Sequence, residues 1–245
     1  MAARRRLDAE LVRRGLVVSR AEAQVAIADQ RVLVNGAVAE KPARMVGAAD
    51  AVVITGPPPR FVGRGGEKLD AALERFGIDV AGRRVLDVGA STGGFTDALL
   101  SRDAREVVAL DVGHGQLHPR LRGDDRVTVL ERTNIRSATP DTIGGRVDAV
   151  VVDVSFISLS VVIPQLVGLC QPGSPMILLV KPQFEAGRGR GVITDPAIHE
   201  RVRGEIDTAL VAAGCTVEAW MESPIRGSAG NREFLVHATT PEGPE

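Results

Sequence analysis

The chain has 245 residues, 44% of them hydrophobic and 25% charged, with a formal net charge of −1. This length and hydrophobic content are sufficient for one large domain, or for one medium and one small domain, around an aliphatic core. No apolar run approaches the roughly 20 residues of a membrane span, and the arginine-rich N-terminus lacks the apolar segment of a signal peptide. Cys170 and Cys215 have no metal-ligand spacing, so we expect two buried free thiols and no bound metal. We therefore expect a cytoplasmic protein that does not bind a membrane.

The charge is distributed unevenly along the chain. Residues 1–60 contain ten Lys and Arg against six Asp and Glu, whereas the remainder contains 20 against 25. A basic N-terminal part on a mildly acidic body favours a polyanionic partner for the small part.

The N-terminal part begins with signals for two short helices. Leu7 and Leu11 lie at helical spacing, and Gly15 is placed to end this first helix. Ser19 is a predicted N-cap for the second helix, because Glu22 three residues later completes a capping box.

Strand signals follow the two helices. Residues 32–38 alternate around Asn35-Gly36, a dipeptide typical of a tight β-hairpin. Residues 52–54 read Val-Val-Ile and close the unit as another strand. The sequence therefore predicts a small α+β unit over residues 1–55.

This unit resembles the S4 RNA-binding domain. The resemblance is carried by the strings Arg-Leu-Asp, Leu-Val-Arg-Arg-Gly, Ser-Arg, Val-Leu-Val-Asn-Gly and Lys-Pro, in that order. It implies that basic side chains of this unit contact RNA phosphates. The expected RNA-binding residues are Arg4, Arg6, Arg20, Lys41 and Arg64. A solvated helix face with ordinary arginines is the alternative.

A change of composition marks the next boundary. Gly56 precedes three consecutive prolines, which cannot continue a helix or a strand, so we expect a linker over residues 56–63. A second domain is expected over 64–238 and a disordered tail over 239–245. The second domain opens with a helix that carries Lys68 in its first turn, where a cation opposes the helix dipole.

Strands and helices then alternate, as in a parallel sheet with helices on both faces. The expected strands lie near residues 85–88, 107–111, 127–130, 147–153, 176–181, 215–221 and 232–238, and the expected helices near 94–101, 117–121, 158–169 and 196–213. The last connection, 222–231, is too short for a parallel crossover, so the last strand should be antiparallel. This pattern resembles the Rossmann-like sheet of class I methyltransferases.

The segment 85–97 is expected to form a buried strand, a glycine-rich turn and the start of a helix, a unit that binds small ligands. Its glycine spacing is G-x-x-x-G-G instead of the G-x-G-x-x-G of the dinucleotide fingerprint, which disfavours NAD. The string Asp-Val-Gly-Ala-Ser-Thr-Gly-Gly-Phe is similar to motif I of S-adenosylmethionine-dependent methyltransferases of the ribosomal-RNA 2′-O type. A tight turn without ligand is the alternative.

Further cofactor contacts are expected at the ends of the next strands. Asp111 follows the second strand, where a carboxylate can accept ribose hydroxyls, although it could instead cap a turn. Asn134 follows the third strand and is the candidate on the adenine side. The expected cofactor-binding residues are Asp87, Gly89, Ala90, Ser91, Thr92, Gly93, Gly94, Asp111, Asn134 and Asp153.

Four charged residues are expected to converge at the same edge of the sheet. Asp153 and Lys181 each end an apolar strand. Glu233 begins the antiparallel strand, and Lys68 lies on a helix that can cover the crevice. This Lys…Asp…Lys…Glu order resembles the tetrad of FtsJ-like ribose 2′-O-methyltransferases. A salt-bridge cluster that only stabilises the crevice is the alternative.

Together with the S4-like unit, the chain resembles the TlyA family of ribosomal-RNA cytidine 2′-O-methyltransferases, historically labelled haemolysins. The resemblance implies S-adenosylmethionine as cofactor, ribosomal RNA or ribosomal subunits as partner, no metal, and the four charged residues as catalytic groups. We expect Lys181 to be the general base, Lys68 the neighbouring cation, and the protein to be a monomer. A non-catalytic ribosome assembly factor and a haemolysin-like activity are the alternative functions.

Overall fold

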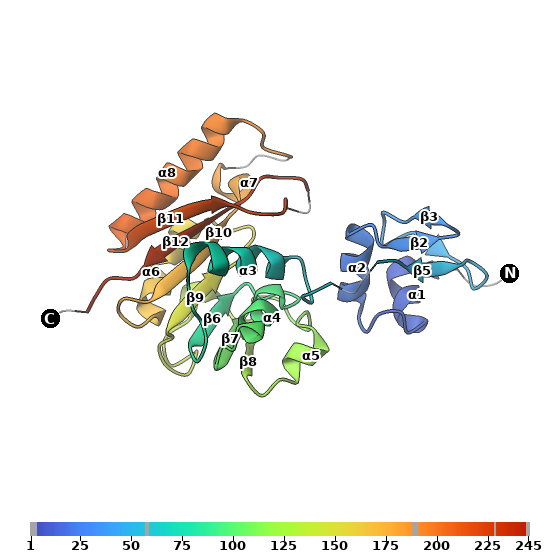
Figure 1. The fold of residues 1–245 in the computed structure, drawn as a ribbon, viewed down its shortest axis with the longest axis horizontal. Coiled ribbons are helices and arrows are strands. Elements are labelled where there is room, and N and C mark those ends of the chain that lie inside the picture. Colours follow the sequence, from blue (N-terminus) through green and yellow to red (C-terminus); the bar gives the residue numbers. More distant parts are fainter. Residues whose placement is uncertain (1–3, 57–58, 188–190, 228, 244–245) are drawn as a thin grey trace. The chain divides into compact units, whose positions relative to one another are not determined.

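The computed structural model describes residues 4–56, 59–187, 191–227 and 229–243 (Figure 1). The chain divides into two compact units, Met1–Arg64 and Gly65–Glu245. The predicted linker includes residues 57–58, which lie outside the described residues.

The N-terminal unit combines two helices with short antiparallel strands. Its elements are β1 (Arg5–Arg6), α1 (Leu7–Arg13), α2 (Arg20–Ala28), β2 (Val32–Val34), β3 (Ala37–Val38), β4 (Met45–Val46) and β5 (Val52–Ile54). Strand β2 lies between β3 and β5, and β1 pairs with β4. The predicted cap is present, since the Ser19 hydroxyl accepts the Glu22 N–H at 3.1 Å. Asn35 and Gly36 both have positive φ, as the hairpin turn requires.

The C-terminal unit is built on a seven-stranded sheet. Its strands are β6 (Arg84–Val88), β7 (Glu106–Leu110), β8 (Val127–Leu130), β9 (Ala149–Val152), β10 (Pro175–Val180), β11 (Thr216–Glu222) and β12 (Phe234–Thr239). Its α-helices are α3 (Gly65–Phe76), α4 (Gly94–Ser101), α5 (Pro119–Arg122), α6 (Leu159–Leu169), α7 (Pro182–Glu185) and α8 (Pro196–Ala212). The strand order is β11-β12-β10-β9-β6-β7-β8.

Strand direction confirms the predicted sheet. Strands β6 to β10 pair in parallel, whereas β12 is antiparallel to both β10 and β11. In the β10–β12 register, Val180 lies opposite Phe234. The first residues of β12 therefore lie beside the last residues of β10, at the edge where the parallel strands end.

Both faces of the sheet are covered by helices. Leu86 and Val88 belong to one core with apolar residues of α6 and α8. On the opposite face, Asp87 contacts Thr96 of α4, and His237 stacks on Phe76 of α3. Strands covered on both faces are mostly apolar, so apart from residues such as Asp87 and His237 the polar side chains concentrate at the strand ends.

The C-terminal segment corrects one expectation. A disordered tail was predicted from residue 239, but Thr239 ends β12 and Thr240 is buried. The Thr240 N–H donates to the Ser174 carbonyl at 3.0 Å, and the Gly173 N–H donates to the Pro241 carbonyl at 3.1 Å. These backbone bonds hold residues 239–241 against the loop before β10.

Candidate active site

The glycine-rich turn connects β6 to α4 and passes very close to the end of β9. Gly89 has a φ of 86°, and a Cβ at this position would overlap the carbonyl oxygen of Asp153. Gly93 has a φ of 98°, and a Cβ there would overlap Leu121. Only glycine meets both demands, so the two glycines allow the turn to pack closely against the end of β9 and against α5.

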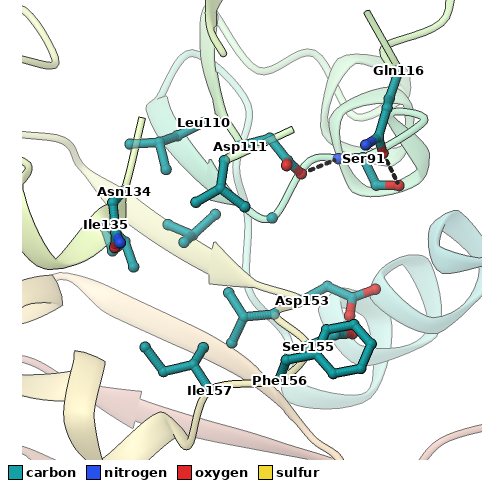
Figure 2. Close-up of a pocket in the computed structure, with 14 residues that line it drawn as sticks. Ser91, Leu110, Asp111, Gln116, Asn134, Ile135, Asp153, Ser155, Phe156 and Ile157 are labelled. Atoms are coloured by element: carbon teal, nitrogen blue, oxygen red, sulfur yellow. Dashed lines mark hydrogen bonds between the residues drawn. The ribbon is translucent and has the colours of Figure 1, made fainter. Parts of the chain in front are cut away.

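A cavity of about 460 Å³ lies at the carboxyl ends of β6, β7 and β9 (Figure 2), within the size range of small-ligand sites. Its lining is mostly apolar and consists of Val88, Gly89, Ser91, Leu110, Asp111, Val112, Gln116, Asn134, Ile135, Asp153, Val154, Ser155, Phe156 and Ile157. The Asp111 carboxylate accepts the Ser91 N–H at 2.8 Å and the Gly113 N–H at 2.6 Å. Each carboxylate oxygen can accept a further hydrogen bond.

The predicted cofactor residues fall into three groups. Gly89, Ser91, Asp111, Asn134 and Asp153 line this cavity. Three more residues line an adjoining smaller pocket beside the same turn, namely Ala90, Thr92 and Gly94. The remaining two, Gly93 and Asp87, line neither of these two cavities.

Asp87 lies beneath the turn instead of in the cavity. Its side chain is fully buried, and its Oδ2 accepts the Thr96 hydroxyl at 2.6 Å. Burial raises the pKa of Asp87 to about 7. The carboxylate therefore ties β6 to α4 from below the turn.

Sequence reasoning missed Gln116 and Phe156. Gln116 follows the Asp111 turn and accepts the Ser91 hydroxyl at 3.3 Å. Its place in a polar loop after the second strand could have indicated that it lines the cofactor cavity. The Phe156 side chain is 90% exposed, and the residue has a φ of 68°. No sequence pattern indicates this backbone conformation, which is uncommon for a bulky residue.

Two lysine–carboxylate pairs lie at the same edge of the sheet. Lys181, directly after β10, forms an ion pair with Asp153, directly after β9, and its amine donates to the Ser155 hydroxyl at 3.1 Å. Lys68 of α3 lies 2.5 Å from Oε2 of Glu233. The four predicted charged residues are thus brought together as two pairs, each lysine with its own carboxylate.

The two pairs differ in burial. The side chains of Lys68 and Glu233 are 9% and 3% exposed, while those of Lys181 and Asp153 are 11% and 23% exposed. Glu233 also accepts the Gln183 side-chain N–H at 3.3 Å. The Lys68 pair is therefore enclosed, whereas the Asp153 carboxylate reaches the cavity.

A second cavity, of about 380 Å³, adjoins the first. Lys181 and Glu233 both line it. Ser155 and Phe156 line both cavities, and the Phe156 ring packs against Phe184 with their centroids 5.0 Å apart. The Lys181–Asp153 pair consequently joins the two cavities, since Asp153 lines one and Lys181 the other.

The predicted RNA-binding residues all lie in the N-terminal unit. Arg4 and Lys41 are exposed. Arg6 and Arg20 both contact Asp8, and Arg64 lies 3.5 Å from Asp29. Their role in RNA binding stays a prediction.

Two other features bear on the class of protein. No helix in the described parts of the chain is long and apolar enough to cross a membrane. Among the same described residues, no group of three or more His, Cys, Asp and Glu side chains is arranged to hold a metal ion.

Comparisons with known proteins agree with this geometry. Residues 61–240 match the model of the FtsJ-like methyltransferase family, and residues 5–52 match the S4 domain. The 16S/23S rRNA (cytidine-2′-O)-methyltransferase TlyA of Mycobacterium tuberculosis is 49% identical, over 98% of this chain and 91% of the relative. Hemolysin A of Brachyspira hyodysenteriae is 37% identical, over 95% of this chain and 98% of the relative.

A solved structure from Streptococcus thermophilus is 38% identical and has a TM-score of 0.77, covering 100% of this chain and 91% of that one. The similarity to these proteins extends over both units and is far above the level at which only a fold is shared. The chain therefore belongs to the TlyA family, in which an S4 domain precedes an FtsJ-like methyltransferase domain.

Proposed function

We propose that this protein transfers a methyl group from S-adenosylmethionine to the ribose 2′-hydroxyl of a cytidine in ribosomal RNA. The observation that carries the proposal is the Lys181–Asp153 ion pair, which lies where the two cavities meet. A methyltransferase needs a donor site and an acceptor site that open onto one reacting group, and this pair is shared between them.

The first cavity suits the cofactor. Its apolar walls match an adenine ring, with Asn134 at the adenine side, and Asp111 offers lone pairs to ribose hydroxyls. Gly89 lets the turn pass in contact with the Asp153 backbone, which places Ser91 of the turn and Asp153 in the lining of the same cavity. S-adenosylmethionine would supply an electrophilic methyl group when bound here, and Asp153 presents a carboxylate to the same cavity.

The second cavity suits the acceptor nucleotide. Lys181 is the general base: its amine, when neutral, takes the proton that the ribose hydroxyl loses on methylation. Asp153 and Ser155 orient this amine through their contacts with it. The exposed Phe156 ring offers a face on which an unstacked base can lie.

Lys68 and Glu233 support this arrangement from the enclosed side. Their pairing fixes the start of β12 against α3 and keeps a compensated charge beside the acceptor cavity. Gln183 adds a hydrogen bond to Glu233 and lines the same cavity. This role holds the acceptor wall in place and does not require either group to exchange a proton.

The S4 unit supplies RNA affinity. Arg6, Arg20 and the exposed Arg4 and Lys41 give it a set of cations for phosphates. An rRNA substrate implies that the enzyme works in the cytoplasm. A monomeric state remains our expectation from the sequence.

The test is methylation of ribosomal subunits in vitro with radiolabelled S-adenosylmethionine, followed by mapping of 2′-O-methylated riboses. We expect incorporation at cytidine riboses with the wild-type protein and none with Lys181→Arg. A matched binding measurement with S-adenosylhomocysteine should give the same affinity for both proteins. Incorporation into bases, or rRNA binding without any methyl transfer by the wild type, would contradict the proposal and favour an assembly factor.

A further inference from the structure

A fully buried carboxylate lies at the centre of the basic N-terminal unit. The Asp8 side chain is 0% exposed, and Arg6 binds it with two nitrogens, at 3.1 and 3.0 Å. Arg20 donates to the same Oδ2 atom at 2.8 Å, and the Ala9 N–H donates to Oδ1 at 2.9 Å. The hydrogen bonds from Arg6 hold the pKa of Asp8 well below its usual range, so the carboxylate stays ionised.

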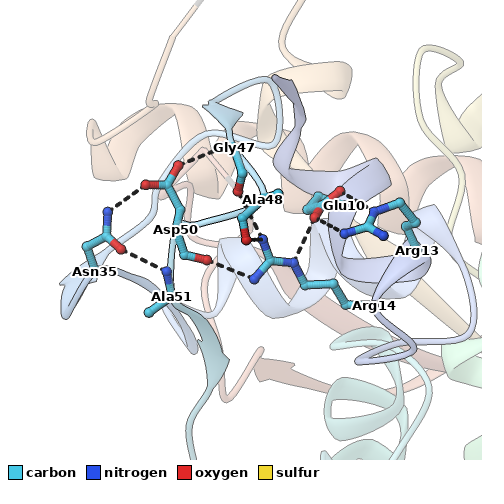
Figure 3. Close-up of polar contacts among 8 residues, drawn as sticks. All are labelled: Glu10, Arg13, Arg14, Asn35, Gly47, Ala48, Asp50 and Ala51. Atoms are coloured by element: carbon cyan, nitrogen blue, oxygen red, sulfur yellow. Dashed lines mark hydrogen bonds and ion pairs between the residues drawn. The ribbon is translucent and has the colours of Figure 1, made fainter. Parts of the chain in front are cut away.

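Two residues further along α1, Glu10 binds a second arginine pair (Figure 3), in which the Arg13 side chain is 52% exposed but the Arg14 side chain only 19%. Arg13 and Arg14 both donate to Glu10, at 2.6 to 2.8 Å. Arg14 also donates to the carbonyls of Asp50 and Gly47, at 2.8 and 3.0 Å. Its guanidinium is used to tie α1 to the loop before β5, which is a structural task.

Both arginines of the Asp8 cluster are exposed to solvent. The side chains of Arg6 and Arg20 are 47% and 57% exposed, although the carboxylate that holds them is buried. The two guanidiniums meet on one oxygen of Asp8 and remain side by side in spite of their like charge. Each guanidinium has further N–H groups beyond those that bind Asp8, and such groups are donors of the kind that bind phosphate.

We propose that Asp8 is a positioning residue that holds Arg6 and Arg20 as a preformed clamp for one phosphate of the RNA backbone. The proposal rests on the proposed function, because it assumes that the S4 unit binds rRNA. Ordering a long side chain on binding has an entropic cost. Asp8 removes much of this cost for two arginines at once.

The proposal is tested by the direction in which the substitution Asp8→Asn changes the affinity for RNA. Asp8→Asn raises the net charge of the unit by one, so simple attraction to a polyanion would tighten RNA binding. The clamp predicts the opposite, because an amide cannot hold two guanidiniums as an ionised carboxylate does. We expect the Kd for a ribosomal subunit, measured with the full-length protein, to rise about five- to tenfold. An unchanged or tighter Kd overturns the clamp.

Glu10→Gln is the matched control. It makes the same change of charge on the same helix, at a buried carboxylate that holds two arginines. We expect its Kd for the subunit to stay within twofold of the wild type, with thermal unfolding confirming that both variants are folded. A loss equal to that of Asp8→Asn would show a general effect of α1 and overturn the proposal.

Arg6→Lys keeps the test decisive if Asp8→Asn does not fold. It preserves the positive charge but cannot bind Asp8 with two nitrogens, so we expect it to lose nearly as much RNA affinity as Arg6→Ala. Full affinity of Arg6→Lys would contradict the clamp while leaving RNA binding by the S4 unit intact. Full affinity of both Arg6→Ala and Arg20→Ala would instead refute the RNA-binding role on which the proposal rests.

Discussion

The carboxylates around the first cavity, the cofactor side, have different partners from those around the second cavity, the acceptor side. On the acceptor side, Glu233 is paired with Lys68, and Asp153, at the boundary, is paired with Lys181. On the cofactor side, the hydrogen bonds that Asp111 accepts from the described residues come from the backbone N–H groups of Ser91 and Gly113.

Asp87, beneath the cofactor turn, marks the extreme of this contrast. Its Oδ2 has a hydroxyl donor, while no partner for its buried Oδ1 is found among the described residues. Of these two carboxylates only Asp111 lines the cavity and keeps lone pairs available for ligand hydroxyl groups, whereas the buried Asp87 supports the turn from below. A lysine-paired carboxylate instead fixes an amine. The difference matches the tasks of the two sides, binding and proton transfer.

Lys181 should give the largest effect, because the acceptor side depends on an amine that can lose its proton. Lys181→Ala is expected to lower the rate of methyl transfer by about 10²–10⁴. Lys181→Arg should not restore it, because a guanidinium stays protonated. Single-turnover methylation of ribosomal subunits at saturating cofactor measures this step.

Binding measurements complete the Lys181 test. The affinities of Lys181→Arg for S-adenosylhomocysteine and for the ribosomal subunit should remain close to those of the wild type. If Lys181→Arg retains the wild-type rate, the pair is an electrostatic support and another group takes the proton.

Substitutions in the enclosed Lys68–Glu233 pair should mainly change the free energy of unfolding. Lys68→Met leaves Glu233 buried without its cation, which is expected to lower the free energy of unfolding by about 3–5 kcal/mol. The double variant Lys68→Met/Glu233→Leu removes both charges and should recover most of this loss. Chemical denaturation of the single and double variants provides the measurement.

Activity of the double variant then sharpens the contrast between the two pairs. If the Lys68 pair only supports the acceptor wall, the restored fold should keep a methylation rate far above that of Lys181→Ala. A rate as low as that of Lys181→Ala would show that Lys68 or Glu233 takes part in the chemistry.

The sequence was sufficient to predict the sheet and the edge where the charged residues meet. The short 222–231 connection required an antiparallel last strand, and this placed Glu233 beside Lys181. The lysine pairing could not be predicted, because it depends on how α3 and β12, 165 positions apart at Lys68 and Glu233, pack side by side. Asp87 was listed with the cofactor residues because it belongs to the motif around the glycine-rich turn. Its direction could not be predicted, since strands buried on both faces lack the alternation that shows which way a side chain points.

Asp87→Asn tests the cofactor side through pH. Burial raises the pKa of Asp87 from 3.8 to about 7, so between these values the folded protein keeps a proton that the unfolded chain loses. The contribution of Asp87 to stability therefore falls as the pH rises through this window, and the penalty is complete above pH 7. Asn does not titrate and can still accept the Thr96 hydroxyl.

The measured quantity is the difference in unfolding free energy between Asp87→Asn and the wild type. As the pH rises from about 4 to about 7, we expect the wild type to lose stability relative to the variant, by up to about 4 kcal/mol. A difference that is constant over this range would show that Asp87 is already ionised in the fold.

Asp111 should give the smallest effect and tests the binding task alone. Asp111→Asn keeps the side-chain shape but replaces one carboxylate oxygen by an amide that cannot accept the N–H of Ser91 or Gly113. The turn then loses one anchor, and a ribose hydroxyl loses a charged acceptor. One charge-assisted hydrogen bond corresponds to about 1.5–3 kcal/mol, so the Kd for S-adenosylhomocysteine in calorimetry should rise by roughly tenfold or more. The methylation rate at saturating cofactor should change little, since the proton-accepting amine is untouched. A large fall in that rate with an unchanged Kd would reverse the assignment and place Asp111 with the acceptor side.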